Sequence, residues 1–217
     1  MTRDWVRWHS AYDDGTSALS RRLEVVRRNL RRALAEAPAD HDGTQRVVSM
    51  CAGDGRDVLP VLAEQDHSHR IRALLVELDP TLSGRARSTA RDLRLKGVEV
   101  RTTDAGTIDA YPEGVPAHIL LACGVFGNIS FADARRTIDA LPSLMTAGGF
   151  VIWTRGGNDD PDPSIAIRES FGTSGFHEVS FTAPAHDRFR VGMSRLEAEP
   201  DAGRRPHRGS RLFTFAQ

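Results

Sequence analysis

Apolar residues recur along the chain with two different periods. From residue 17 to residue 37 they return every three or four positions, a spacing that predicts one long amphipathic helix. From residue 45 onward, short apolar runs of strand length alternate with stretches of helical period. The runs predict strands at residues 46–51, 71–78, 98–102, 118–123 and 149–154. Helices are predicted between most of these strands, at residues 56–64, 80–95 and 131–141.

This alternation has a topological consequence. Strands that are separated by helices pair in parallel and carry helices on both faces of the sheet. After a further predicted helix at residues 164–174, two strands at residues 176–182 and 189–196 share a short loop and should pair antiparallel. Residues 211–215 are a candidate for a short last strand. The sequence therefore predicts an α/β fold, a doubly wound, mostly parallel seven-stranded sheet with antiparallel C-terminal strands.

The chain is expected to form one compact unit with two parts. Residues 1–44 are predicted to form an N-terminal helical cap, whose first segment would fold as a lid over the carboxyl edge of the sheet. Residues 45–217 carry the alternation of strands and helices. A total of 217 residues suits a single α/β domain.

The charge balance restricts the partners of the protein. Lys+Arg and Asp+Glu both number 29, so the formal net charge is zero. A protein that coats nucleic acid or an anionic membrane needs a basic excess, which is missing here. The long N-terminal helix does carry a basic face, for which RNA binding is one interpretation. A solvated face is favoured because no aromatic stacking platform lies among its arginines.

Cysteine usage and apolar runs indicate the compartment. Two cysteines, Cys51 and Cys123, do not make a disulfide framework. No apolar stretch near the N-terminus has the pattern of a signal peptide, and no run approaches the ~20 residues of a membrane span. We therefore expect a cytoplasmic protein with no membrane partner.

The clearest chemical signal lies after the first predicted strand. A buried strand runs into a turn that contains Gly53 and Gly55, and a predicted helix follows. Glycines in such a turn let the backbone approach a ligand, and the start of a helix offers free N–H groups to an anion. A tight turn without a ligand is the alternative.

A second signal is the acid at the end of the second strand. Glu77 stands where a carboxylate accepts both hydrogen bonds of a ribose diol. Its alternative role is a surface acid that caps the next helix, although Asp79, directly before Pro80, suits the cap better. The glycine turn and Glu77 together predict the nucleoside-binding half of a doubly wound sheet.

Two more strand ends should meet the same edge of the sheet. Asp104 follows the third strand and could accept from an adenine amine, or lie solvated in its loop. The fourth strand ends at Cys123 and leads into a loop that begins with Gly124. Ligands in open α/β sheets bind at this carboxyl edge.

The order of these motifs resembles that of class I S-adenosylmethionine (SAM)-dependent methyltransferases, over about residues 45–196. The motifs are CAGDGRD, VELDP, TTDA, ACGVFGN and AGGFVIW. The resemblance implies a Rossmann-like methyltransferase fold with SAM as cofactor. It assigns the methionine part of SAM to the loop that includes Cys51, Ala52, Gly53 and Gly55. It further assigns the ribose to Glu77, the adenine to Leu78, Asp104 and Ala105, and the floor under the sulfonium to Cys123 and Gly124.

The resemblance extends to a narrower bacterial group of uncharacterised small-molecule methyltransferases, through the opening WxxWHxxYDD and the closing LFTF. The chain also departs from the superfamily pattern. Ser49 stands where an acid is usual, and Cys51 stands where many members have glycine. The Asn/Asp-Pro-Pro-aromatic tetrads of DNA and protein methylases are absent from the sequence. The expected activity is methyl transfer to an O, N or C nucleophile of a small molecule.

Candidates for contact with the acceptor are His9, Tyr12, Asn128 and Arg155. His9 and Tyr12 lie in the segment expected to form the lid, where packing against the body is the alternative. Asn128 follows the fourth strand and could instead be a turn residue. Arg155 ends the fifth strand and could pair with an acid of the next loop. No catalytic residue and no metal site is predicted.

Two other functions stay open. The changes at Ser49 and Cys51 are compatible with a methyltransferase-like protein that binds SAM without transferring its methyl group. An NAD(P)-dependent oxidoreductase is disfavoured because Val58 replaces the third small residue of the dinucleotide fingerprint and Lys96 is the only lysine. A homodimer is compatible with the sequence.

Overall fold

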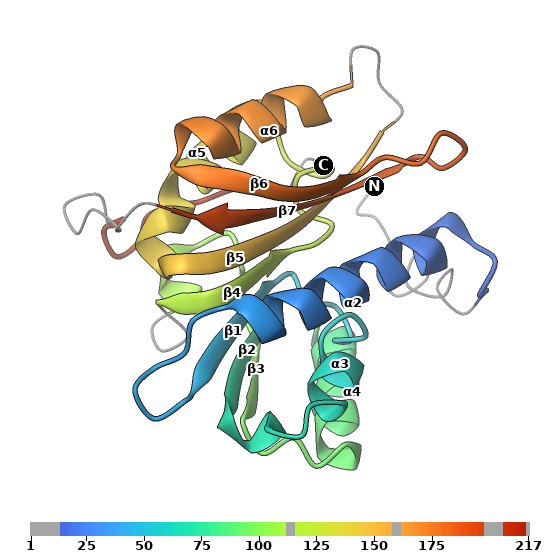
Figure 1. Ribbon diagram of the computed structural model, residues 1–217, viewed down its shortest axis with the longest axis vertical. Coiled ribbons are helices and arrows are strands. Elements are labelled where there is room, and N and C mark those ends of the chain that lie inside the picture. Colours follow the sequence, from blue (N-terminus) through green and yellow to red (C-terminus); the bar gives the residue numbers. More distant parts are fainter. Residues whose placement is uncertain (1–13, 112–115, 158–161, 198–205, 216–217) are drawn as a thin grey trace.

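The computed structural model describes residues 14–111, 116–157, 162–197 and 206–215. Seven strands form a single sheet in the order β3-β2-β1-β4-β5-β7-β6 (Figure 1). The strands are β1 (Gln45–Met50), β2 (Ile71–Glu77), β3 (Val98–Thr102), β4 (Ala117–Ala122), β5 (Met145–Gly156), β6 (Phe176–Thr182) and β7 (Phe189–Leu196). Strands β1 to β5 pair in parallel, whereas β7 pairs antiparallel with both β5 and β6. The predicted doubly wound sheet with antiparallel C-terminal strands is confirmed.

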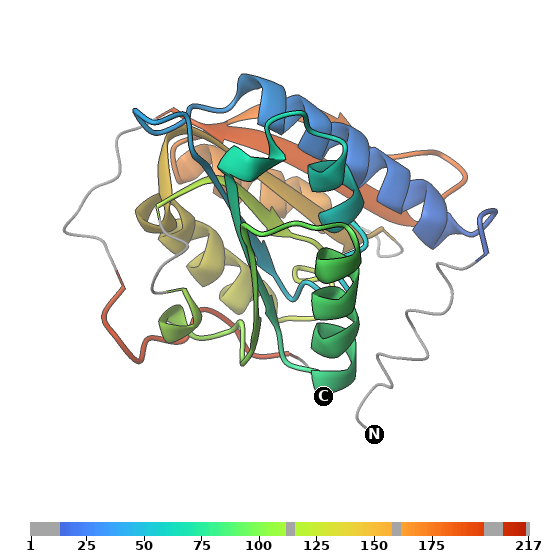
Figure 2. The same ribbon diagram turned by 90° about the horizontal axis from the view of Figure 1, so that it is seen from below.

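Helices cover both faces of the sheet (Figures 1 and 2). They are α2 (Ala18–Glu36), α3 (Leu59–Ala63), α4 (Pro80–Asp92), α5 (Phe131–Ala140) and α6 (Ser164–Thr173). Buried residues form two hydrophobic clusters, one beneath α2, α3 and α4 and the other beneath α5 and α6. Along β1, Val47 belongs to the first cluster and Val48 and Met50 to the second, as alternating strand side chains require. Because both faces are covered, the inner residues of β2 and β4, at 73–76 and 119–122, are all apolar.

Helix starts follow the predicted capping chemistry. Asp79 precedes Pro80, and its carboxylate accepts from the N–H groups of Thr81 and Leu82. Ser130 caps α5 by accepting from the N–H of Asp133. The assignment of Asp79 to the cap is therefore confirmed, and the carboxylate of Glu77 is left for another role.

Several boundaries differ from the prediction. Strand β5 (Met145–Gly156) extends beyond the predicted residues 149–154 at both ends, and α4 ends at Asp92 instead of residue 95. Two further differences are larger in consequence. The helix expected at residues 56–64 begins only at Leu59, because Gly55 adopts φ +75° and residues 53–58 form turns before the chain becomes helical. Residues 211–215 do not form a strand of the sheet. They make two isolated bridges, Thr107 with Arg211 and Ile129 with Phe215, while Leu212 and Phe213 are buried in the core.

Helix α2 packs on β5, β7 and α3, and thus on a face of the sheet. Its apolar stripe, which includes Val26 and Leu30, is buried there. The helical part of residues 1–44 therefore belongs to the layered body. The segment predicted to close as a lid, residues 1–13, lies outside the described residues.

An aromatic cluster fills the core beneath α6. Trp153 on β5 stacks on Phe171 of α6 with ring centroids 5.8 Å apart, and Phe126 packs edge-on against both. Directly across the sheet, Trp153 pairs with Gly192 of β7. A Cβ atom at Gly192 would collide with the indole, so glycine provides the space that the tryptophan occupies.

Candidate functional site

The loop after β1 bends sharply at the carboxyl edge of the sheet. Cys51, Gly53 and Gly55 all have positive φ, at 51°, 58° and 75°. Hydrogen bonds tie this loop to β2, where the N–H of Ala52 donates to the carbonyl of Val76 at 2.9 Å. The loop therefore has a fixed shape and presents its backbone at the edge where ligands of such sheets bind.

The backbone of Cys51 adopts a conformation that favours glycine. The left-handed region costs a residue with a Cβ atom roughly 1 kcal/mol relative to glycine. Burial is the main reason that the pKa of the Cys51 thiol lies well above its ordinary value, and the nearby Glu77 carboxylate adds to this rise. The thiol is therefore neutral at physiological pH and is not an activated nucleophile.

Replacing Cys51 with glycine should give a more stable protein than replacing it with alanine. Both changes remove the thiol, so the comparison isolates the backbone, and the glycine variant should melt about 2–4 °C higher. Calorimetry of both variants measures this difference. As a control, Cys123 has no positive φ, so there alanine should be the more stable replacement. The same order at both positions would contradict the backbone explanation.

Glu77 is the last residue of β2 and lies at this edge. Its side chain is 9% exposed, and its two oxygens accept from different segments, Oε2 from the N–H of Gly53 and Oε1 from the N–H of Asp79, each at 2.8 Å. Burial is the largest influence and raises the pKa of Glu77, while the two N–H donors act in the opposite direction. The carboxylate thus links the glycine loop to the end of β2, where the resemblance puts the ribose.

Leu78 lies next to this carboxylate and is 65% exposed, an unusual exposure for a large apolar side chain. An apolar surface beside a buried acid suits the flat face of a nucleobase next to its sugar.

The third strand end differs in detail from the expected adenine contact. Asp104 Oδ1 accepts from the N–H of Gly106, and its Oδ2 pairs with Arg211 at 2.9 Å. Ala105 is buried, and its carbonyl accepts from the hydroxyl of Tyr111. The structure brings Asp104 to the predicted edge, but an adenine amine would have to share the carboxylate with Arg211. Sequence reasoning missed Arg211 because it lies 107 positions away along the chain.

The end of β4 provides open space at the same edge of the sheet. Gly124 has φ +75°, and a Cβ atom there would meet no atom within 4 Å. Its N–H donates to Thr154 Oγ1 of β5 at 2.8 Å, which fixes the loop. Burial raises the pKa of the neighbouring Cys123 thiol well above its ordinary value, so the floor assigned to this residue is neutral.

The predicted acceptor contacts have structural roles in the described residues. Asn128 Nδ2 donates to the carbonyl of Gly124 at 2.7 Å. Arg155 donates to the carbonyl of Phe126. Both side chains support the loop after β4, and contact with an acceptor stays a prediction for each. His9 and Tyr12 lie outside the described residues.

Asp57 is a buried acid that the sequence pattern did not single out. It follows the glycine loop, and its Oδ1 is shielded from solvent and has no hydrogen-bond partner among the described residues. Burial is the main cause that raises the pKa of Asp57 to about 6, with Asp54 adding to the rise and Arg22 opposing it. Ser49 is also buried with an unpartnered hydroxyl. A buried carboxylate with one unpartnered oxygen is suited to a cationic ligand group such as an ammonium.

Replacing Asp57 with asparagine should change how stability depends on pH. Because the folded pKa lies above the ordinary 3.8, the folded protein binds this proton more tightly than the unfolded chain. Its contribution is full below pH 3.8 and is lost as the pH rises through about 6. A difference of about two pKa units corresponds to about 3 kcal/mol. The variant should match the parent near pH 4 and exceed its free energy of unfolding by about this amount at pH 8.

Urea titrations between pH 4 and pH 8 test this expectation. Asp66→Asn is the matched control, since Asp66 is exposed and should leave the pH profile of the parent unchanged. A constant difference between Asp57→Asn and the parent at every pH would show that Asp57 does not titrate in this range.

Comparison with known proteins shows what kind of fold surrounds this site. Neither a protein-family model nor the sequence of a curated protein matches the chain. Magnesium protoporphyrin IX methyltransferase from Synechocystis PCC 6803, solved with bound SAM, matches with a TM-score of 0.66 and 15% identity, over 90% of this chain and 92% of that one. An O-methyltransferase family protein from Burkholderia thailandensis gives 0.65 and 16% over 82% of this chain, which spans 56% of its length. An rRNA methylase from Streptococcus thermophilus gives 0.59 and 14% over 77% of this chain and 94% of that one.

These likenesses show that the chain has the fold of class I SAM-dependent methyltransferases, as the resemblance implied. At such identities they show the fold alone. The named targets of two of these proteins, magnesium protoporphyrin IX and ribosomal RNA, belong to different chemical classes, so the fold leaves the acceptor open. In the described parts of the chain, every helix is too short or too polar to cross a bilayer.

Proposed function

We propose that this protein is a SAM-dependent methyltransferase that methylates an O, N or C nucleophile of a small molecule. One observation carries the proposal. The buried carboxylate of Glu77 accepts a hydrogen bond from the N–H of Gly53 in the glycine loop, and the exposed Leu78 follows Glu77 directly. An acid, a glycine loop and an apolar surface at one edge are the groups that bind a ribose, an amino-acid tail and a base.

The residues of the edge fit SAM chemically. The carboxylate of Glu77 would hold the ribose hydroxyls, and Leu78 would pack on the adenine. Asp57, whose Oδ1 lacks a partner among the described residues, would receive the ammonium of the methionine part. Gly124, with no atom within 4 Å of its missing Cβ, leaves room for the sulfonium beside the end of β4.

When bound, SAM supplies a methyl group on a positive sulfur, and transfer forms the bond from the acceptor nucleophile to that carbon as the sulfur–carbon bond breaks. The protein contributes alignment and exclusion of water. The rigid loops after β1 and β4, each held by hydrogen bonds to a neighbouring strand, provide that alignment. A proton on the acceptor leaves to solvent or to a base, which is needed less for a phenol or a carboxylate.

The charges of α2 favour a small acceptor over RNA. Four of its arginines, Arg21, Arg27, Arg31 and Arg32, pair with the acids Asp187, Glu24, Glu64 and Glu36. RNA binding depends on unpaired basic groups that replace counterions along the phosphates. A net charge of zero and a helix in which four of six arginines pair with acids supply few such groups.

The proposal is tested by measuring formation of S-adenosylhomocysteine from SAM. The purified protein would be incubated with SAM and panels of phenols, carboxylic acids and amines, and separately with total RNA. Turnover with a small acceptor supports the proposal, and turnover with RNA alone would overturn its substrate class. Binding of SAM without turnover on any acceptor would favour the interpretation as a SAM-binding protein without transfer activity.

A further inference from the structure

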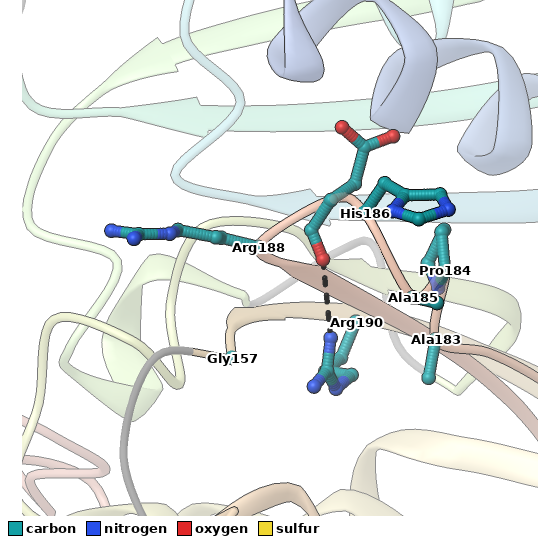
Figure 3. A pocket seen from close by; sticks show the side chains of 8 residues that line it. Gly157, Ala183, Pro184, Ala185, His186, Arg188 and Arg190 are labelled. Atoms are coloured by element: carbon teal, nitrogen blue, oxygen red, sulfur yellow. Dashed lines mark hydrogen bonds between the residues drawn. The ribbon is translucent and has the colours of Figure 1, made fainter.

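A second concave site lies on the other half of the carboxyl edge. It has a volume of about 400 Å³ and is lined by Gly157, residues 183–188 of the β6–β7 hairpin, and Arg190 (Figure 3). This volume lies within the range of small-molecule pockets, ~300–1,000 Å³. The described residues assigned above to the cofactor do not line it.

The pocket lies close to the loop after β4. Gly157 follows the end of β5, and its N–H donates to the carbonyl of Arg188 at 3.0 Å. A Cβ atom at Gly127 would lie 3.4 Å from the amide nitrogen of Gly156, so the loop after β4 touches the end of β5. In the sheet order, β1, β2 and β3 lie on one side of this loop and β5, β7 and β6 on the other. The nucleoside residues and the pocket therefore occupy the two halves of one edge.

Two acids near the pocket, among the residues that the structure describes, are paired with arginines. Asp187 pairs with Arg21 of α2, and this contact lowers the pKa of the Asp187 carboxyl. In Figure 3 the side chains of Arg188 and Arg190 leave the hairpin in different directions. Asp162 accepts from Arg190 Nε at 2.6 Å. These two pairs remove the negative charge that would repel an anion.

Among the described residues that line the pocket, Arg188 carries a positive charge that no acid compensates. Its side chain is exposed, and in the described part of the chain its guanidinium has no hydrogen bond and no ion pair. A guanidinium offers five N–H donors in a planar fork that matches a carboxylate. His186 lines the same pocket, and its imidazole offers a further N–H donor.

We propose that this pocket holds a carboxylate of the methyl acceptor, with Arg188 as its ion-pair partner. The inference rests on the proposed methyltransferase function and gives its substrate class, a small carboxylate-bearing molecule. The acceptor would span the edge from Arg188 toward Gly124, with its anionic end anchored and its nucleophile directed to the cofactor half. Three arginines of α2 pair with acids and so offer little free positive charge to phosphates. The surroundings of the pocket therefore do not resemble an RNA-binding surface.

Ligand-observed NMR with matched pairs tests this assignment. Each pair consists of an aromatic carboxylic acid and its carboxamide, such as 4-hydroxybenzoate and 4-hydroxybenzamide, added to the protein with and without S-adenosylhomocysteine. The acids should bind and the amides should not. Arg188→Gln should weaken binding of the acids by about tenfold or more and leave S-adenosylhomocysteine binding within about twofold of the parent. Arg85→Gln, an exposed arginine on α4, serves as control and should change neither affinity.

Several results would overturn the inference. The inference fails if acids and amides bind equally, or if no acid binds. It also fails if Arg188→Gln binds the acids as the parent does. Binding of a short RNA that depends on Arg188, in place of the acids, would overturn it as well. A loss of S-adenosylhomocysteine binding in Arg188→Gln would reassign the residue to the cofactor. If the parent protein fails to bind S-adenosylhomocysteine while the acids still bind, the proposed function fails and the anion pocket stands.

Discussion

Replacing Glu77 with alanine is expected to weaken the binding of S-adenosylhomocysteine by about 100-fold or more. A carboxylate that receives two ribose hydroxyls makes two charge-assisted hydrogen bonds, each worth roughly 1.5–3 kcal/mol. Together they exceed the roughly 2.8 kcal/mol that corresponds to a factor of 100. Calorimetric titration of parent and variant measures the ratio directly.

The side chain of Glu77 also stabilises the apo protein, so the test needs two further variants. Glu77 accepts from the N–H groups of Gly53 and Asp79, and alanine leaves both without this partner. Glu77→Gln keeps the size of the side chain and one acceptor oxygen, and should lose affinity by an intermediate factor of about ten. Glu64→Gln, at an exposed acid on the surface, should bind like the parent. Unchanged affinity in folded Glu77→Ala would contradict the assignment of the ribose to this residue.

Replacing Gly192 with alanine is expected to lower the free energy of unfolding by about 3 kcal/mol, at the upper end of what overpacking costs. A Cβ atom at this position would overlap the indole of Trp153, which is itself held by its stack on Phe171. The indole is almost fully buried and cannot move without disturbing the aromatic cluster. Thermal unfolding should show a melting temperature about 6–12 °C lower.

A second glycine provides the control for this prediction. Gly172 lies within α6, and a Cβ atom there would meet nothing within 4 Å. Gly172→Ala should therefore raise stability by roughly 0.4–1 kcal/mol through the lower entropy of the unfolded chain. If both alanine variants melt like the parent, the close contact of Gly192 with Trp153 is not a constraint on the core.

Local patterns explain why much of the fold was predictable. The strands at residues 98–102, 176–182 and 189–196 have the predicted bounds, because apolar runs and turn residues set them within a few positions. Asp79 and Ser130 identify their helix starts through side chains that bond two or three positions ahead. The start of α3 was misplaced because the positive φ of Gly55 prolongs the loop, a conformation that glycine permits without requiring it.

Site features that depend on distant residues could not be predicted. The pair of Asp104 with Arg211 and the pair of Asp187 with Arg21 each join segments that only the folded chain brings together. The titration of Asp57 follows from burial behind the glycine loop, and a sequence pattern carries no measure of burial. By contrast, Glu77 and the glycine loop were predicted because both lie directly at strand ends, where the topology of the sheet fixes their location.

The central claim is that the carboxyl edge of this sheet binds SAM. Calorimetric titration of the purified protein with S-adenosylhomocysteine, with NAD as comparator, tests it most directly. The account predicts micromolar binding of S-adenosylhomocysteine and no heat with NAD. Absence of S-adenosylhomocysteine binding would contradict the claim, and binding of NAD in its place would assign the edge to a dinucleotide and the protein to the oxidoreductases.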